Sequence, residues 1–300
     1  MMIELLDKLY SGLRKRTKIQ SSLRFIIREF SNFSLPFYLK FTRKNVQLDK
    51  NNIIVSLTTF PQRIDKIWIV VECMVRQKIR PQKIILWLAK SQFPNEYNDL
   101  PSNLSYYINN KLIDIRFVNE DLRSHKKYYY ALNEYPHSKI IVVDDDIYYP
   151  NTIIVDLINL NNKYPKSICC LRAHKVTFSS NNKLDPYKKW EKVINNHGPS
   201  FELFHTSGGG TLYQKNNFDE SLFDKDIFMT ICANADDVWL NIMAQKNKTM
   251  TVKSNYFSNL IPIKNKSEKL SKHNVTLGGN DLQIKEVINY YKINKNEIFR

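Results

Sequence analysis

Three consecutive carboxylates, Asp144, Asp145 and Asp146, carry the strongest chemical signal in this sequence. They follow the apolar run 140–143 (Ile-Ile-Val-Val), whose composition is typical of a strand buried on both faces of a parallel sheet. The acids therefore come at the carboxyl end of a strand, where open α/β sheets bind ligands. Three adjacent like charges need compensation, which a divalent cation bridging to a phosphate would supply. The alternative is an ordinary acidic turn, because Asp is a good turn former.

A second acidic pair, Asp236 and Asp237, precedes the segment 238–245, which has the composition of a helix. Acids are favoured at a helix N-terminus, so capping is one interpretation, above all for Asp236. A carboxylate at a helix N-terminus in a cleft could instead act as a general base towards a hydroxyl group. Capping explains the second acid, Asp237, less well, so both interpretations stay open for this pair.

A run of three glycines, 208–210, lies between these acidic motifs and uses three of the seven glycines in the chain. Backbone without side chains allows positive φ angles and the close approach of a ligand. The run is not a dinucleotide or Walker phosphate loop, because neither motif's spacing is present. It predicts either a flexible bend or a backbone wall beside a substrate sugar.

The elements that must position these groups alternate along the chain. Apolar runs predict strands at 53–57, 83–88, 113–118, 140–143 and 168–171, and helical spacing predicts helices at 63–76, 124–134, 153–161, 238–245 and 281–292. Strands that alternate with helices indicate an α/β fold with a mainly parallel sheet flanked by helices. We expect one catalytic domain, 50–300, with a nucleotide-binding half (50–172) and an acceptor-binding half (173–300).

Composition limits the class of protein. An apolar fraction of 43% supports a packed core, and a formal charge of +16 indicates an anionic partner. No run of 18 apolar residues predicts a transmembrane helix, and the acids Glu4 and Asp7 interrupt any signal peptide. Four cysteines without a CxxC motif suggest reduced thiols in a cytoplasmic protein and no zinc site.

The first 49 residues form a basic amphipathic N-terminal extension. The first fifty residues carry eleven basic and four acidic side chains, a net charge of +7, interleaved with large apolar residues. Basic and apolar residues in a helix suit an anionic membrane surface, here through residues 1–45. The alternative is a helical extension packed on the domain with a solvated basic face. We expect no nucleic acid partner, because an acidic site argues against a polyanion groove nearby.

The ordered set of motifs resembles the GT-A class of nucleotide-sugar glycosyltransferases. More narrowly, it is similar to the bacterial family 2-like enzymes that build capsule or lipopolysaccharide. Segment 58–63 (Thr-Thr-Phe-Pro-Gln-Arg) matches the Ser/Thr-Pro-x-Arg pattern of that family after the first strand, and 125–128 matches its His-Lys-Lys-Tyr segment. The resemblance covers roughly residues 50–290 and implies a GT-A (Rossmann-like) fold.

The resemblance also implies a donor-binding role for each matching residue. These are Thr58, Thr59, Pro61 and Arg63 beside the nucleotide, Lys127 at the diphosphate, Asp144 and Asp145 at the ribose or metal-bound water, and Gly209 and Gly210 at the donor sugar.

For the metal and the base, the resemblance implies that Asp146, with Asp144, ligates Mn²⁺ or Mg²⁺ and that His273 completes the metal shell. Asp237 would deprotonate the acceptor hydroxyl. The pair before Val238 is Asp-Asp where Glu-Asp is the commoner form, which leaves Asp236 as the alternative base.

The implied function is metal-dependent transfer of a sugar, with inversion, from a UDP-sugar to a hydroxyl of a glycan or lipid-linked acceptor. The reaction would serve bacterial surface polysaccharide synthesis, in the cytoplasm or on the inner face of the inner membrane. A sugar nucleotidyltransferase is one alternative, although it usually needs a Gly-rich loop near the first strand, and 58–63 contains no glycine. A non-enzymatic basic protein that binds membrane or nucleic acid is the other alternative, and it predicts salt-sensitive binding to polyanions.

Overall fold

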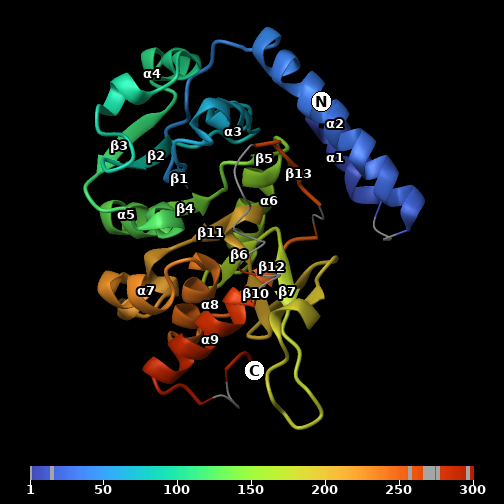
Figure 1. Cartoon of the computed structure of the whole chain (residues 1–300), viewed down its shortest axis with the longest axis vertical. Helices are drawn as coiled ribbons and strands as arrows, with labels where there is room; N and C mark the ends of the chain where they lie inside the picture. Colours follow the sequence, from blue (N-terminus) through green and yellow to red (C-terminus); the bar gives the residue numbers. More distant parts are fainter. Residues whose placement is uncertain (1, 14–16, 256–258, 266–273, 275–277, 295–297) are drawn as a thin grey trace.

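A central sheet organises the computed structural model, which describes residues 2–13, 17–255, 259–265, 274, 278–294 and 298–300 (Figure 1). The sheet has eight strands in the order β3-β2-β1-β4-β11-β6-β12-β9. Their bounds are β1 Ile53–Thr58, β2 Lys83–Ala89, β3 Asp114–Val118, β4 Lys139–Val142, β6 Ile168–Cys170, β9 His197–Ser200, β11 Thr211–Tyr213 and β12 Thr251–Lys253.

The sheet is mainly parallel. Strands β3, β2, β1 and β4 pair in parallel, and so do β6 and β12. Strand β11 runs antiparallel between β4 and β6, and β9 is antiparallel to β12. Helices cover both faces, so the predicted α/β class with a mainly parallel sheet flanked by helices is confirmed.

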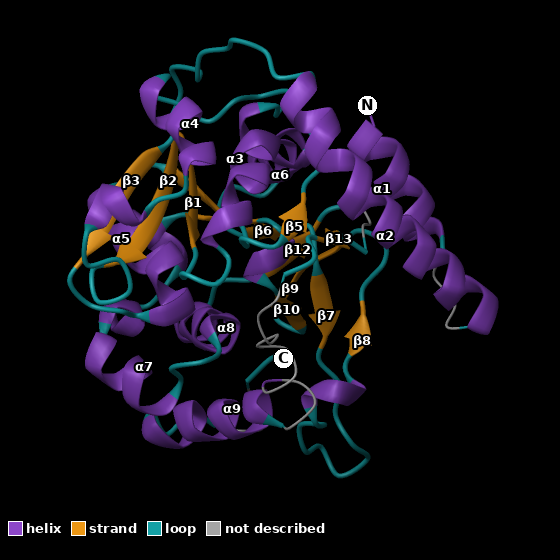
Figure 2. Cartoon of the chain, turned by 45° about the horizontal axis from the view of Figure 1, so that its top comes forward, coloured by secondary structure: helices purple, strands orange, loops and turns teal. Residues whose placement is uncertain are grey.

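Alternation along the strands divides the apolar side chains between two layers. On β4, Ile141 joins one buried cluster, and Ile140 and Val142 join the other. The first layer contains α3 (Ile67–Val75), α4 (Ser105–Asn109) and α6 (Ile153–Lys163). The second contains α5 (Lys126–Glu134), α7 (Lys225–Ile231), α8 (Asp236–Lys246) and α9 (Gly279–Tyr290), as Figure 2 illustrates. The strand that precedes the three acids is therefore buried on both faces.

Two small sheets lie outside the central one. Strand β5 (Ile147–Tyr148), directly after the three acids, pairs with β13 (Ile261–Pro262). Strands β10 (Leu203–His205), β7 (Ala173–Lys175) and β8 (Glu191–Lys192) form the other. The pairing of β5 with β13 brings the segment 261–265 next to the carboxyl end of β4.

The N-terminal extension forms two helices, α1 (Met2–Gly12) and α2 (Lys18–Phe41), which pack on each other at one edge of the molecule (Figure 1). The hydroxyl of Thr17 accepts a hydrogen bond from the Gln20 amide and caps α2. Leu35 and Leu39 of α2 are buried in the same apolar cluster as α3. Among the residues that the structure describes, no helix combines the length and the apolarity that crossing a bilayer requires.

Candidate active site

The three acids follow β4 after one residue, Val143, and contact the cationic side chains of Arg63 and Lys127. Asp145 is buried, and its carboxylate accepts hydrogen bonds from the Thr59 hydroxyl at 2.6 Å and from Arg63 at 2.7 Å. The same Arg63 nitrogen lies 3.0 Å from Asp146. Burial raises the pKa of Asp145, and the guanidinium of Arg63 opposes that shift. The structure thus ties the predicted loop 58–63 to the predicted acidic motif.

The other residues of this loop lie further from the acids. The Thr58 hydroxyl donates to the Trp87 carbonyl at 2.7 Å and so fixes β1 to β2. Pro61 is exposed in the turn that leads to the short 3₁₀ turn η1 (Ile64–Lys66). Among the four residues predicted beside the nucleotide, Thr59 and Arg63 are therefore the two that contact the acids through hydrogen bonds.

Lys127 connects the two acidic motifs. Its side chain extends from the first turn of α5, and the residue is only 4% exposed. The ammonium lies 2.7 Å from Asp144, 3.2 Å from Asp236 and 3.3 Å from the Ser207 hydroxyl. Burial would lower the pKa of Lys127, but the carboxylates around it outweigh burial and raise that pKa. Lys127 stays charged, and its contact with a diphosphate stays a prediction.

His125 helps to hold Lys127 in place. Its ring is fully buried, contacts the Tyr128 hydroxyl at 2.8 Å and the Cys232 carbonyl at 2.9 Å, and stacks on Phe228. These contacts join the start of α5 to the segment that leads into α8. In the matched His-Lys-Lys-Tyr segment, His125 and Tyr128 therefore make buried structural contacts, and Lys127 contacts the carboxylates.

The second acidic pair lies in the first turn of α8, and its two carboxylates differ. Ala235 is the N-cap residue, so Asp236 does not have the capping role considered for it. Burial raises the pKa of Asp237 to about 6, and the neighbouring Asp236 adds to this shift. Burial acts in the same direction on Asp236, but Lys127 and hydrogen bonds outweigh it and lower that pKa to about 2. Asp237 is thus the carboxylate suited to take a proton near neutral pH.

Ser207 and Gly208 are residues that sequence reasoning missed. The Ser207 amide donates to Asp237 at 2.7 Å, and its hydroxyl donates to Asp236 at 3.1 Å. A Cβ atom on Gly208 would lie 1.7 Å from a carboxylate oxygen of Asp144. The glycine run therefore holds the two acidic motifs close together, and the serine before it was the available sequence signal.

Gly209 and Gly210 are buried behind this contact. A Cβ atom on Gly209 would meet Arg172 at 2.5 Å, and Gly210 has a φ of 94°, next to Leu171. Tyr149, which sequence reasoning also missed, fixes the turn to the acids. Its hydroxyl donates to the Gly208 carbonyl at 2.6 Å and accepts from the Asp144 amide at 2.9 Å. Whether the two glycines line a donor sugar stays a prediction.

The predicted metal site is partly within the described residues. These residues contain no cluster of three or more His, Cys, Asp or Glu side chains that could hold an ion, and His273 lies outside them. The side chains of Asp144 and Asp146 are 33% and 25% exposed. Mg²⁺ is usually held by one or two carboxylates together with substrate phosphates. The residues present therefore fit a cation that is shared with a bound diphosphate.

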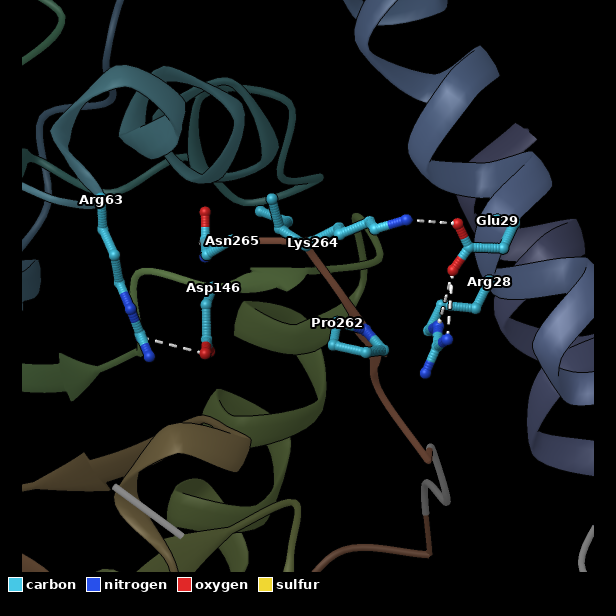
Figure 3. A pocket seen from close by; sticks show the side chains of 8 residues that line it. Arg28, Glu29, Arg63, Asp146, Pro262, Lys264 and Asn265 are labelled. Atoms are coloured by element: carbon cyan, nitrogen blue, oxygen red, sulfur yellow. Dashed lines mark hydrogen bonds and ion pairs between the residues drawn. The ribbon is translucent and has the colours of Figure 1, made fainter. Parts of the chain in front are cut away.

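A cavity of about 160 Å³ lies beside Asp146 (Figure 3). Arg63 and Asp146 line one side of it, and Arg28 and Glu29 of α2 line the other. Its remaining lining residues come from the end of β13 and the segment after it: Pro262, Ile263, Lys264 and Asn265. Glu29 accepts hydrogen bonds from both Arg28 and Lys264, so the N-terminal extension contributes one wall of the cavity.

Comparison with solved structures finds two crystal structures of residues 1–349 of S. aureus TarS. One is in complex with UDP (TM-score 0.43, 10% identity, 69% of this chain and 59% of that chain). The other is in complex with UDP-GlcNAc (TM-score 0.46, 10% identity, 80% and 67%). No protein-family model and no curated protein sequence matches the chain.

Replacing Gly208 by Ala should weaken both the binding of a nucleotide donor and the stability of the fold. The new methyl group would displace the Asp144 carboxylate, which Lys127 also holds. We expect Tm to fall by a few degrees, about 1–3 kcal/mol of overpacking, and the Kd for a nucleoside diphosphate with Mn²⁺ to rise about tenfold. Calorimetric titration and thermal melting would measure both. Gly12→Ala is the matched control, since among the described residues no atom beyond its chain neighbours and its own helix backbone lies within 4 Å of its Cβ position.

The pKa of Asp237 predicts the acid limb of the pH–rate profile. With a pKa of about 6, Asp237 is ionised at pH 8 and protonated at pH 5, where it cannot accept a proton. We therefore expect kcat/KM to be constant above pH 7 and to fall about tenfold per pH unit below about pH 6. Initial rates of nucleoside diphosphate release would give the profile. A flat profile down to pH 5 would exclude Asp237 as the base.

Proposed function

We propose that this chain transfers a sugar from a nucleotide-sugar donor to a hydroxyl group of an acceptor. The observation that supports the proposal is the connection of the two acidic motifs through Lys127 and Ser207. One motif, after β4, has the partly exposed carboxylates Asp144 and Asp146. The other ends in Asp237, whose pKa of about 6 suits a base.

In this proposal the residues after β4 bind the donor. Asp146 and Asp144 would hold Mn²⁺ or Mg²⁺ together with the diphosphate, and Asp145 would keep Thr59 and Arg63 in place. The bound cation would neutralise negative charge that develops on the leaving diphosphate. Asp146→Asn should then abolish the increase in nucleoside diphosphate affinity that Mn²⁺ produces.

Asp237 would accept the proton of the acceptor hydroxyl as that oxygen attacks the anomeric carbon from the face opposite the diphosphate. The new glycosidic bond forms while the bond to the diphosphate breaks, and the configuration inverts. Asp236, with its low pKa, would stay ionised and raise the proton affinity of Asp237.

The finer parts of the proposal rest on the family resemblance: a UDP-sugar donor, a glycan or lipid-linked acceptor, and a role in bacterial surface polysaccharide synthesis. The corresponding location would be the cytoplasmic face of the inner membrane. The four cysteines are free and buried, which suits a reducing compartment.

A thermal-shift panel of nucleoside diphosphates, each with and without Mn²⁺, would test the donor site. Stabilisation by one nucleotide only in the presence of the metal supports the proposal. A product assay would then separate two functions, since nucleoside diphosphate release indicates glycosyl transfer and pyrophosphate release indicates a nucleotidyltransferase. Absence of stabilisation by every nucleotide would contradict both.

A further inference from the structure

An apolar stripe runs along the outer side of α2. Seven large apolar residues recur every three or four positions, and each is between 43% and 82% exposed. They are Ile19, Leu23, Ile26, Phe30, Phe33, Phe37 and Phe41. This spacing places them on one face of the helix, which at 24 residues is about 36 Å long. We call these seven residues the outer stripe.

The opposite side of α2 makes the contacts with the rest of the protein. Ser31, Leu35 and Leu39 are buried, and the Asn32 side chain donates to the Pro262 carbonyl at 3.0 Å. Because the helix is already anchored on that side, the outer stripe is not needed for the fold. Soluble monomers rarely expose a contiguous apolar surface of this length, and such surfaces usually mark a site of interaction.

The exposed charge around the outer stripe has one sign. Within the described part of residues 2–50, the exposed lysines are Lys8, Lys18, Lys40, Lys44 and Lys50. The acid Asp49, whose side chain is 42% exposed, lies beyond the end of α2 and pairs with Arg80. The four acids of this part are buried or half-buried. Glu29, the acid nearest the stripe, is bonded to Arg28 and Lys264. Lys18 and Lys40 lie near the two ends of α2, so the surface is complementary to an anionic one.

We propose that the outer stripe docks on a bilayer that contains anionic lipids, with α2 lying in the plane of the interface. The phenylalanines would enter the boundary between headgroups and acyl chains, and the lysines would contact lipid phosphates. This inference concerns the surface of the N-terminal helices and does not rest on the proposed reaction.

A second copy of the chain suits the outer stripe less well. The spacing resembles that of a coiled coil, in which flanking positions normally carry complementary charges. Here the flanking positions include Gln20, Ser22, Ile27 and Ser34, and Glu29 is already paired within the chain. Two copies would also bring lysines of the same sign together. Docking on an anionic bilayer would not bring like charges together.

The position of the cavity adds a consequence. Arg28 and Glu29, on the inner side of α2, line the cavity beside Asp146 (Figure 3). Docking through the outer stripe would hold this cavity about one helix diameter, roughly 10 Å, from the membrane interface. If the proposed function holds, a lipid-linked acceptor would reach the site without leaving the bilayer.

Vesicle flotation with the full chain would test this inference. We expect binding to mixed phosphatidylglycerol and phosphatidylcholine vesicles, and at least about tenfold weaker binding for the double variant Phe30→Ser with Phe33→Ser. The double variant Lys18→Gln with Lys40→Gln should bind more weakly and lose part of the salt dependence. Because all four side chains are exposed, melting curves should match those of the wild type.

Two single variants provide the matched comparison, since each adds one negative charge to α2. Phe33→Glu changes the outer stripe, whereas Ser21→Glu changes an exposed position outside it. Phe33→Glu should reduce vesicle binding much more than Ser21→Glu, whose effect should be limited to its charge, and Asp237→Asn should bind as the wild type does, whatever its activity. Absence of wild-type binding, or equal loss in both variants, would overturn the inference. So would a dimer in light scattering that Phe33→Glu dissociates without vesicles.

Discussion

Replacing Asp237 by Asn should reduce kcat by about 10²- to 10⁴-fold and leave the Kd of the donor unchanged. The amide oxygen of Asn can still accept the hydrogen bond from the Ser207 amide, so the local structure should persist. The change removes the negative charge and, with it, the ability to take a proton. Steady-state release of nucleoside diphosphate would measure kcat, and calorimetry would measure donor affinity.

The same variant should be more stable than the wild type at neutral pH. The raised pKa of Asp237 means that its stabilising contribution is present below about pH 4 and is lost as the pH rises through about 6. Removing the carboxylate, which is partly exposed, should therefore recover about 1–2 kcal/mol, or about 2–5 °C in Tm. The gain should disappear at pH 4.

Asp226→Asn is the matched control for both measurements, because Asp226 lies in the first turn of α7 and is exposed. It should change neither kcat nor Tm. If Asp237→Asn instead loses donor affinity and activity to the same degree, Asp237 has a structural role, and the assignment of the base is wrong.

Replacing Lys127 by Met should have the largest combined effect on activity and stability. The variant leaves Asp144 and Asp236 without the ammonium that lies between them. Removing one partner of a buried ion pair costs about 3–5 kcal/mol, which corresponds to a fall in Tm of the order of 10 °C. We also expect the pKa of Asp237 to rise further, because Lys127 lowers it, and activity to fall below detection.

Lys126→Met controls for the loss of a lysine from the same helix. Lys126 is also buried, but it pairs with Asp121, whose side chain is 28% exposed, whereas Lys127 also pairs with Asp236, whose side chain is only 12% exposed. This variant should lose less stability and keep activity. Equal losses in the two variants would show that α5 tolerates neither change, and that the bridge between the acidic motifs has no special role.

Local composition was sufficient to predict the strand 140–143 and the helix 153–161, because strong periodicity or a continuous apolar run defines each one. The contact between Gly208 and Asp144 could not be predicted in this way. It depends on the antiparallel pairing of Thr211 with Val142, residues 69 positions apart, and no local signal specifies that register.

The same limit applies to the N-terminal extension. Its composition predicts helices with basic and apolar residues, but not which residues face outwards. In the structure, Arg24, Arg28 and Arg43 are half-buried and contact aromatic rings, whereas Phe33 and Phe37 are exposed. Which side chains of α2 face outwards depends on how this helix packs against α1 and the domain. Local sequence does not specify that tertiary packing.

Because α2 forms one wall of the cavity beside Asp146, removing the N-terminal helices would change that cavity. Composition places a boundary near residue 49, so a fragment that begins at residue 50 looks like a self-contained domain. That fragment would lose Arg28 and Glu29 from the cavity, and it would expose the apolar surface that Leu35 and Leu39 cover. Poor solubility or altered acceptor preference in such a fragment would then reflect the missing helices, and the intact chain is the proper reference for kinetics.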